Sequence, residues 1–359
     1  MRRAVRHALR GTTIAVVGAA VLLSAACRPD KPDIDYTKAA PWVFAGSTMG
    51  TTYHVTIALP PMGQDTRRAL ERRIKDILDD VDAKMSTYKS TSEASQFNAA
   101  RAGQAVPVSS DTMRVVRLAL TVARLSEGAF DPTIEPLVEL WGFGANRSVP
   151  LVPDKIDLAV AGELVNYRKL IADKQTGSLT KKQDGVQIDL SAVAKGYAVD
   201  KAHDALVAAG YPNVMVEVGG EVRTHGLNAD RVPWRIGVDR PNPEAKTGTE
   251  LELVLGVTDT AVATSGDYRN YRIVDGKRIS HTIDPKTRRP VEHGLASVSV
   301  VAPTCALADA LATAANVLGP EKGLRLLEEH ERAEGYLIVH DGTAFRSLKT
   351  SGFDRYIAK

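Results

Sequence analysis

The sequence has 359 residues, of which 44% are hydrophobic and 25% are charged, and its 28 glycines and 18 prolines are spread along the chain. This composition excludes disordered, collagen-like and disulfide-scaffold proteins, and the length allows one large or two medium domains. The net charge of +3 depends on four arginines among the first ten residues. Without residues 1–26 the 46 basic and 43 acidic residues become 42 and 43, so a surface for nucleic acid is not indicated.

The N-terminus has the pattern of a bacterial export signal, which predicts a signal peptide over residues 1–26. Its apolar stretch is too short to span a hydrocarbon core of roughly 30 Å, and small residues directly precede Cys27. Lipidation of Cys27 is the favoured interpretation, although Ser24 stands where such sites usually have Leu. An uncleaved anchor and simple secretion are the alternatives. A lipoprotein would lie at the bacterial cell envelope, anchored to the membrane on its periplasmic or extracytoplasmic face.

The polar residues that follow predict a tether over residues 27–44, which lifts the domain off the membrane. The only other cysteine, Cys305, cannot pair with a lipidated Cys27, so an exported domain must rely on its hydrophobic core. Cys305 precedes an Ala-rich segment and is interpreted as a small packed residue, not as a nucleophile.

Hydrophobic periodicity predicts the elements of the remaining chain. Residues 52–58 alternate as in a half-buried strand, whereas apolar residues recur at helical spacing over residues 65–84 and 111–126. Strands grouped with strands and helices with helices predict an α+β fold. Further strands are predicted at residues 186–190, 214–218, 234–238, 251–257, 271–274, 296–301 and 336–339, and helices at 306–318 and 321–329.

Polar, Gly-containing segments interrupt these elements, and such loops usually carry function or form tight turns. Taken singly, the segments at residues 46–51, 85–88 and 128–133 are equally explained by turns, helix ends and core packing. At residues 188–197 a strand leads into a helix whose exposed N–H groups could hold a phosphate beside Lys195. A strand-to-helix turn with a solvated lysine explains the same residues.

Two further groupings indicate catalysis and metal binding. His281 and Asp284 lie beside a proline turn, which suits acid, base or phosphate-contact roles, although a lone histidine is usually structural. Asp309 and Thr313 are four residues apart on a predicted helix and therefore share one face. A carboxylate and a hydroxyl so placed offer two hard oxygen ligands, which favours magnesium over zinc.

The order of these segments, more than any one of them, resembles a known family. The segments are GSTMGTTY, MSTYKSTSE, GAFDPTIEPLVELWGFG, DLSAVAKGYAVD, VEVGGEV, ATSGDYRNY, HTIDPKT and ADALATA. This set is similar to that of the ApbE family, the FAD:protein FMN transferases. The resemblance implies a two-lobed α+β fold over residues 45–350, with mixed or antiparallel sheets flanked by helices and FAD in the cleft between the lobes.

The resemblance also implies a reaction and its partners. Members of the family use Mg²⁺ to cleave FAD and transfer its FMN half to a threonine or serine hydroxyl of a target protein as a phosphoester, releasing AMP. The expected acceptor is an exported or membrane-bound electron-transfer protein. Two alternatives stay open: a Mg²⁺-dependent FAD pyrophosphatase that gives free FMN and AMP, and a non-catalytic flavin-binding lipoprotein.

Matching motifs assign roles to residues of this chain. Two positions depart from the usual pattern, because Arg288 stands where the family often has Gly and Glu221 where Asp is more usual. His281 is the expected base for the acceptor hydroxyl, with Asp284 as the alternative base or orienting residue. The resemblance implies FAD contacts at Met49, Tyr88, Ala129, Phe130, Asp131, Asp189, Lys195 and His281, and Mg²⁺ ligands at Asp309, Thr313 and the backbone carbonyl of Ala192.

Overall fold

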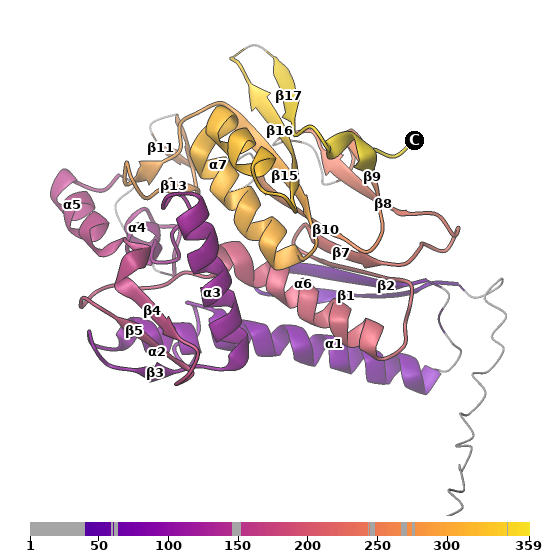
Figure 1. Cartoon of the computed structure of the whole chain (residues 1–359), viewed down its shortest axis with the longest axis horizontal. Helices are drawn as coiled ribbons and strands as arrows, with labels where there is room; N and C mark the ends of the chain where they lie inside the picture. Colours follow the sequence, from indigo (N-terminus) through magenta and orange to yellow (C-terminus); the bar gives the residue numbers. More distant parts are fainter. Residues whose placement is uncertain are drawn as a thin grey trace, which may run out of the picture. The chain divides into compact units, whose positions relative to one another are not determined.

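An eight-stranded sheet forms the centre of the described structure (Figure 1). The computed structural model describes residues 40–58, 60, 64–145, 152–242, 244, 248–266, 271–274, 277–342 and 344–359. Neighbouring strands of the sheet are antiparallel throughout. In spatial order the strands are β1 (Trp42–Thr48), β2 (Thr51–Ile57), β6 (Val214–Val218), β7 (Glu221–His225), β10 (Ala261–Gly266), β15 (Leu295–Ala302), β16 (Glu334–His340) and β17 (Phe345–Lys349).

Different layers bury the two faces of this sheet. Alternating residues of β10 show the division, since Ala261 and Ala263 belong to the core beneath the helices and Val262 to the core on the other face. The first face is covered by α1 (Gln64–Met85), α6 (Ser191–Ala208) and α7 (Cys305–Glu328) (Figure 1). The second is covered by the hairpin of β8 (Trp234–Asp239) and β9 (Leu251–Val257) and by the short helix η2 (Phe353–Tyr356).

Two insertions into the sheet order carry the smaller elements. A third core, centred on Leu137, Trp141 and Ile283, joins residues of both insertions, so segments far apart in the sequence meet there. Between β2 and β6 lie α2 (Glu93–Ala99), β3 (Val106–Pro107), α3 (Ser110–Leu125), α4 (Glu135–Leu140), α5 (Lys155–Leu164), η1 (Tyr167–Lys169), β4 (Leu170–Asp173) and β5 (Ser178–Lys181); between β10 and β15 lie β11 (Tyr271–Val274), β12 (Lys277–Ser280), β13 (Ile283–Asp284) and β14 (Arg289–Pro290).

The structure confirms the α+β prediction and most predicted elements. Strands β6, β9 and β11 have the predicted bounds, and α3 lies within one residue of them. The two predicted C-terminal helices form α7, whose helical geometry breaks at Gly319 with φ 79°, directly before Pro320. The prediction of a strand at residues 186–190 is wrong. There Ile188 exchanges backbone hydrogen bonds with the Asn98 amide at 2.7 and 3.0 Å, and only Gln187 forms a bridge.

The two ends of the folded region differ from the expected limits of 45 and 350. Strand β1 begins at Trp42, so its first residues lie within the segment predicted as a tether. At the other end η2 follows residue 350, and its Phe353 is completely buried. The predicted signal peptide, Cys27 and most of the tether lie outside the described residues.

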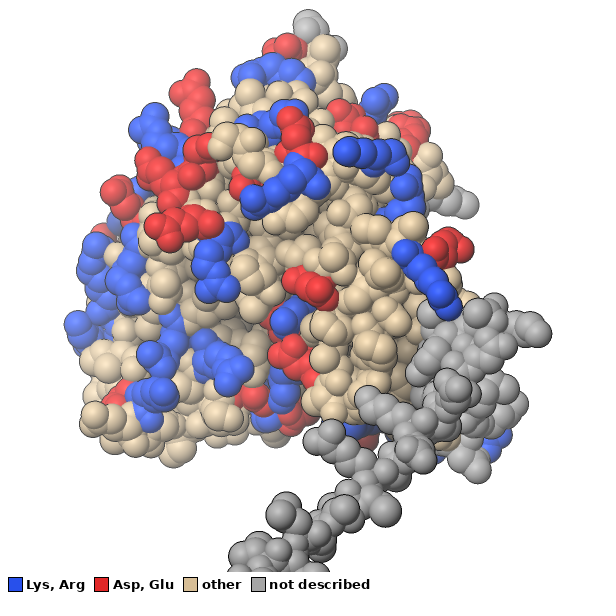
Figure 2. Space-filling view, turned by 45° about the vertical axis from the view of Figure 1, so that its right-hand side comes forward, with Lys and Arg blue, Asp and Glu red and all other residues tan. Residues whose placement is uncertain are grey.

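The surface and the helices give two further observations. On the face shown in Figure 2, acidic and basic side chains lie among one another, in keeping with the nearly equal numbers of the two after residue 26. Within the described ranges, every helix is too short or too polar to cross a membrane.

Candidate active site

Helices α6 and α7 approach each other closely near their N-terminal ends, and this crossing carries the central charged cluster. Gly196 permits the approach, because a Cβ at this position would lie 2.4 Å from the carbonyl oxygen of Cys305. The N–H of Gly196 donates to Oδ2 of Asp309 at 3.1 Å. Glycine therefore allows a buried carboxylate of α7 to lie against the first turns of α6.

Lys195 lies between two buried carboxylates at this crossing. Its Nζ is 3.2 Å from Oε1 of Glu221 and 3.8 Å from Oδ2 of Asp309. The side chains of Glu221 and Asp309 are only 5% and 3% exposed. Oε2 of Glu221 is buried and has no hydrogen-bond partner among the described residues. Two carboxylates thus face one ammonium group, and Oε2 of Glu221 accepts no hydrogen bond from the described residues.

The pKa values of the cluster follow from this imbalance. Burial raises the pKa of Glu221 to about 8, and attraction to Lys195 offsets only part of the effect. Burial also raises the pKa of Asp309, again against attraction from Lys195. For Lys195, burial alone would lower the pKa, but the two carboxylates outweigh it and the pKa is raised. A further cation at the crossing would stabilise the ionised carboxylates.

The predicted Mg²⁺ ligands lie on the two helices of this crossing. Thr313 follows Asp309 by one turn of α7, and its hydroxyl is 3.1 Å from that of Ser265 on β10. Ala192 is the second residue of α6, and the N-cap residue of that helix, Leu190, makes no side-chain capping hydrogen bond. The described residues contain no group of three or more His, Cys, Asp or Glu side chains that could hold a metal ion. The predicted ligand set has a single carboxylate, with a hydroxyl and a carbonyl oxygen.

The carboxylate of Asp131 accepts hydrogen bonds from other residues of the chain. Oδ1 accepts from the N–H and the hydroxyl of Thr133 at 2.8 and 2.6 Å, and Oδ2 accepts from the N–H of Tyr167 at 2.8 Å. The side chains of Ala129 and Phe130, just before it, are buried. Asp131 therefore shapes the segment to which the resemblance assigns FAD contacts, and its own contact with FAD stays a prediction.

Asp189 connects the same segment to α6. Its N–H donates to the carbonyl of Pro132 at 2.9 Å, and its Oδ1 accepts from the N–H of Ser191 at 2.7 Å. Nearby Glu135 is a buried acid that the sequence pattern does not single out, because an acid in the first turn of a helix is ordinary. Burial, with smaller contributions from Asp189 and Glu139, raises the pKa of Glu135 to about 9, so it is neutral at pH 7.

We expect Glu135→Gln to stabilise the protein at alkaline pH. The pKa of Glu135 rises from 4.5 to about 9 on folding, so the folded state holds a proton that the unfolded chain has lost. Stability therefore falls as pH rises through this interval, and glutamine removes the dependence. The expected gain in the free energy of unfolding is at least ~1.4 kcal/mol at pH 9, the worth of one pKa unit, and near zero at pH 4. Equal gains in urea denaturation at both pH values would contradict the assignment.

Tyr88, Phe143 and His281 come together from three segments. The hydroxyl of Tyr88 donates to the carbonyl of Phe143 at 3.3 Å, and the rings of Phe143 and His281 meet edge to face with centroids 6.4 Å apart. The next residue, Thr282, accepts from the amide of Asn316 at 3.2 Å. Because Asn316 lies on α7, the helix of the predicted metal ligands, the His281 segment is bound to that helix.

Met49 lies in the turn between β1 and β2. Met49 and Gly50 have φ values of 49° and 74°, the combination found in tight two-residue hairpin turns. Two residues later Thr52 accepts from the N–H of Gly219 at 3.0 Å, in the turn that leads into Glu221. The structure thus places Met49 at the same end of the sheet as Glu221.

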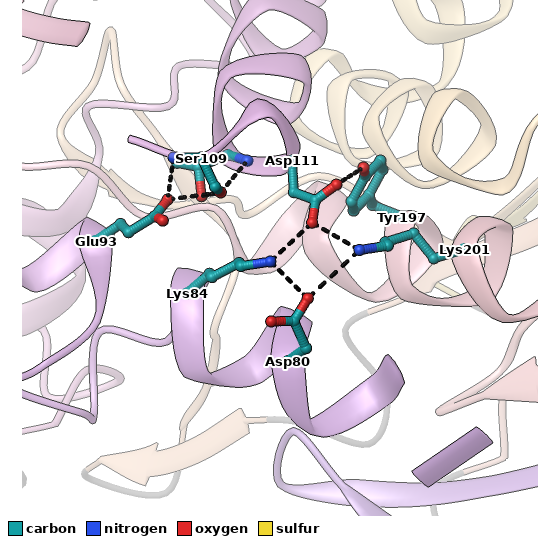
Figure 3. A network of polar contacts seen from close by, with 8 residues as sticks. Asp80, Lys84, Glu93, Ser109, Asp111, Tyr197 and Lys201 are labelled. Carbon is teal, nitrogen blue, oxygen red and sulfur yellow. Dashed lines mark hydrogen bonds and ion pairs between the residues drawn. The ribbon is translucent and has the colours of Figure 1, made fainter. Parts of the chain in front are cut away.

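A network of ion pairs holds α6 against α1 and α3 (Figure 3). Asp111 accepts from the Tyr197 hydroxyl and from Lys201 at 2.6 Å each, and from Lys84 at 2.9 Å. Asp80 pairs with both lysines. Burial alone would raise the pKa of Asp111, but hydrogen bonds from Lys201, Tyr197 and Lys84 outweigh it and hold the pKa well below its usual range. The network thereby fixes the helix on which Lys195 lies.

Comparison with known proteins identifies the family of this chain. A model of the ApbE family matches residues 49–337. The chain belongs to the ApbE family. Within that family, the FAD:protein FMN transferase of Vibrio cholerae serotype O1 is 38% identical over 315 residues, 88% of this chain and 92% of the relative. That of Salmonella typhimurium is 35% identical over 351 residues, 96% of this chain and 97% of the relative.

Solved structures of ApbE proteins share the fold. The flavin transferase ApbE from Vibrio cholerae has a TM-score of 0.81 at 36% identity, covering 89% of this chain and 100% of that one. The apo form of the flavinyl transferase ApbE from Pseudomonas stutzeri has a TM-score of 0.79 at 36% identity, covering 89% and 98%. These matches confirm the ApbE resemblance and the α+β fold. The two lobes and the position of FAD between them stay predictions.

In this ApbE protein the sequence pattern missed one partner in the site. It marked Glu221 only as a departure from the usual Asp, whereas the structure brings its carboxylate to Lys195. The available signal in the sequence was the side chain of Glu221, which is longer than that of Asp and carries its charge farther from the backbone. The structure brings Lys195 within 3.8 Å of Asp309. The other expected FAD contacts lie in groups around Met49, Asp131 and Tyr88.

Proposed function

We propose that this protein transfers the FMN half of FAD to a threonine or serine hydroxyl of a target protein and releases AMP. The cluster of Lys195, Glu221 and Asp309 carries the proposal, in a chain whose relatives are named FAD:protein FMN transferases. The ammonium group of Lys195 and the positive end of the α6 dipole offer positive charge to a pyrophosphate.

We also propose that Mg²⁺ binds at the crossing of α6 and α7, held by Asp309, Thr313 and the carbonyl of Ala192. The donors fit, because all three are oxygens of the kind that Mg²⁺ prefers. Two buried carboxylates, Asp309 and Glu221, face the single ammonium group of Lys195, which supports a further cation at this crossing. When bound, the ion would neutralise charge on the phosphates during transfer.

His281 is the proposed base. As the acceptor oxygen forms its bond to the FMN phosphorus, the bond from that phosphorus to AMP breaks and His281 takes the hydroxyl proton. The histidine is held in place by its edge-to-face contact with Phe143 and by the hydrogen bond that Asn316 of α7 donates to the neighbouring Thr282. Asp284 is assigned an orienting role, because its Oδ1 already accepts from the N–H of Lys286 at 2.8 Å.

Incubation of the purified protein with FAD, Mg²⁺ and an exported electron-transfer protein tests this function. The acceptor is used intact and with its candidate threonine replaced by alanine. Intact-mass analysis is expected to show a gain of one FMN less one water on the intact acceptor, no gain on the alanine variant, and no gain with EDTA. Free FMN with an unmodified acceptor would indicate hydrolysis of FAD and contradict the transfer.

We further propose that the protein is exported and bound to the membrane through a lipid on Cys27. The apolar signal before Cys27 supports this, and both lie outside the described residues. Cys27→Ala is expected to move the protein from the membrane fraction to the soluble fraction. Cys305→Ala is the matched control, because Cys305 is buried in the domain, and this variant should stay with the membrane. A wild-type protein found entirely in the soluble fraction would refute the anchor.

A further inference from the structure

The turn after His281 and Asp284 contains Arg288 at the position where the family often has glycine. Strands β13 and β14 are joined by this turn, in which the N–H of Arg288 donates to the carbonyl of Asp284 at 2.8 Å. Arg288 has a φ of 62°, in the left-handed region that favours glycine. The chain thus keeps the backbone conformation of a glycine turn while carrying a long, charged side chain.

The side chain of Arg288 binds helix α5. Its two terminal nitrogens donate to the carbonyl of Ala159 at 3.2 Å and to Oε1 of Glu163 at 2.8 Å. It crosses the helix over Gly162, where a Cβ would lie only 2.1 Å from Nε of Arg288. Gly162 lies within a regular helix and has no positive φ, so space for Arg288 is the physical reason for a glycine there.

The backbone of Arg288 binds the end of α4 on the other side of the turn. Its carbonyl accepts from the indole N–H of Trp141 at 3.0 Å, and the carbonyl of Trp141 accepts from Arg272 at 2.9 Å. Trp141 is buried, and Phe143, two residues later, contacts the ring of His281. The turn is therefore held from two directions, by a side chain on α5 and by a backbone contact at the end of α4.

We infer that Arg288 is a positioning residue, which binds the turn to α5 and so sets the place of His281 beside Phe143. The inference rests on the proposed function, in which His281 takes the proton of the acceptor hydroxyl. A small displacement of such a base slows the chemical step far more than it weakens substrate binding. A residue that only stabilised the fold would not separate kcat from KM in this way.

Two variants remove the same contact from opposite sides. Arg288→Gly keeps the turn's backbone conformation and deletes the side chain, while Gly162→Ala places a methyl group in its path. Each is expected to lower kcat for FMN transfer about tenfold and to leave KM for FAD within about twofold. The double variant should be no slower than either single one, because the second change has nothing left to remove. Gly256→Ala, whose Cβ would have neighbours no closer than 3.7 Å, is the matched control.

Hydrogen exchange of the amides at residues 286–289 measures the stability of the turn and does not depend on FMN transfer. We expect exchange about tenfold faster in both variants than in the wild type and the Gly256→Ala control. If the wild type transfers no FMN, the proposed function fails, but hydrogen exchange still tests the contact between the turn and α5. Faster exchange in the two variants would support that contact, and unchanged exchange would overturn it. Unchanged kcat in Arg288→Gly, or an equal loss from Gly162→Ala in the wild-type and Arg288→Gly backgrounds, would overturn the positioning role.

Discussion

Replacement of Asp309 by asparagine is expected to lower the rate of FMN transfer by about 10³-fold or more, a loss of ~4 kcal/mol of transition-state stabilisation. Asparagine keeps an oxygen for the N–H of Gly196, so the close approach of α6 and α7 is preserved. It removes the negative charge that faces Lys195 and that would hold Mg²⁺. The loss therefore falls on catalysis and on the response to Mg²⁺, and not on the fold.

Asp230→Asn is the control for this variant, because Asp230 is exposed in the loop between β7 and β8. Its rate should stay within about twofold of the wild type, as for most surface changes. Rates are measured as FMN bound to the acceptor over time, with unfolding curves recorded for both variants. An Asp309→Asn protein with more than about a tenth of the wild-type rate would remove Asp309 from the metal site.

Asp111→Asn is expected to lower the free energy of unfolding by about 2–3 kcal/mol at pH 7. The variant leaves Lys84 and Lys201 with Asp80 as their remaining acid in the network, and the Tyr197 hydroxyl loses a charged acceptor (Figure 3). Because α6 is held by these contacts, the loss should also loosen the helix that carries Lys195. Urea denaturation measures the stability.

The pH dependence of that loss has a definite sign. Folding lowers the pKa of Asp111 from 3.8, so its contribution is present above this value and is lost as pH falls further. The difference between the wild type and Asp111→Asn should therefore shrink below about pH 4. Asp79→Asn, which breaks the exposed pair with Lys75 on the same helix as Lys84, should have a much smaller effect on stability, because solvent screens an exposed ion pair. Equal losses in the two variants would contradict the role of Asp111.

Sequence periodicity predicts an element where one face of it is buried and the other is not. Strand β6 shows this, since Val214, Val216 and Val218 are buried and the residues between them are only partly buried. Strand β10 was missed because it begins with three successive buried residues from Ala261 and ends in small polar ones, so it has no alternation. Strand β7 was missed for another reason. It begins with Glu221, which is buried, whereas the sequence alone predicts that an acidic residue lies at the surface.

The candidate site could be predicted in its residue types and only in part in its contacts. The spacing of Asp309 and Thr313 is a local property of one helix, so the sequence reveals it. The contact of Glu221 with Lys195 depends on β7 lying beside α6, which no local pattern specifies. Likewise, Tyr167 binds Asp131 from 36 positions away, so a residue expected to contact FAD could not be seen from the sequence to organise a loop.

The ratio of AMP released to FMN attached is the measurement that tests the proposed function most directly. The wild-type protein, FAD, Mg²⁺ and the acceptor are incubated, the nucleotides are separated by chromatography, and the acceptor is weighed intact. The account predicts one AMP for each FMN on the acceptor, with no free FMN, and formation of both products about 10³-fold more slowly by Asp309→Asn. AMP accompanied by an equal amount of free FMN, with the acceptor unmodified, would contradict it.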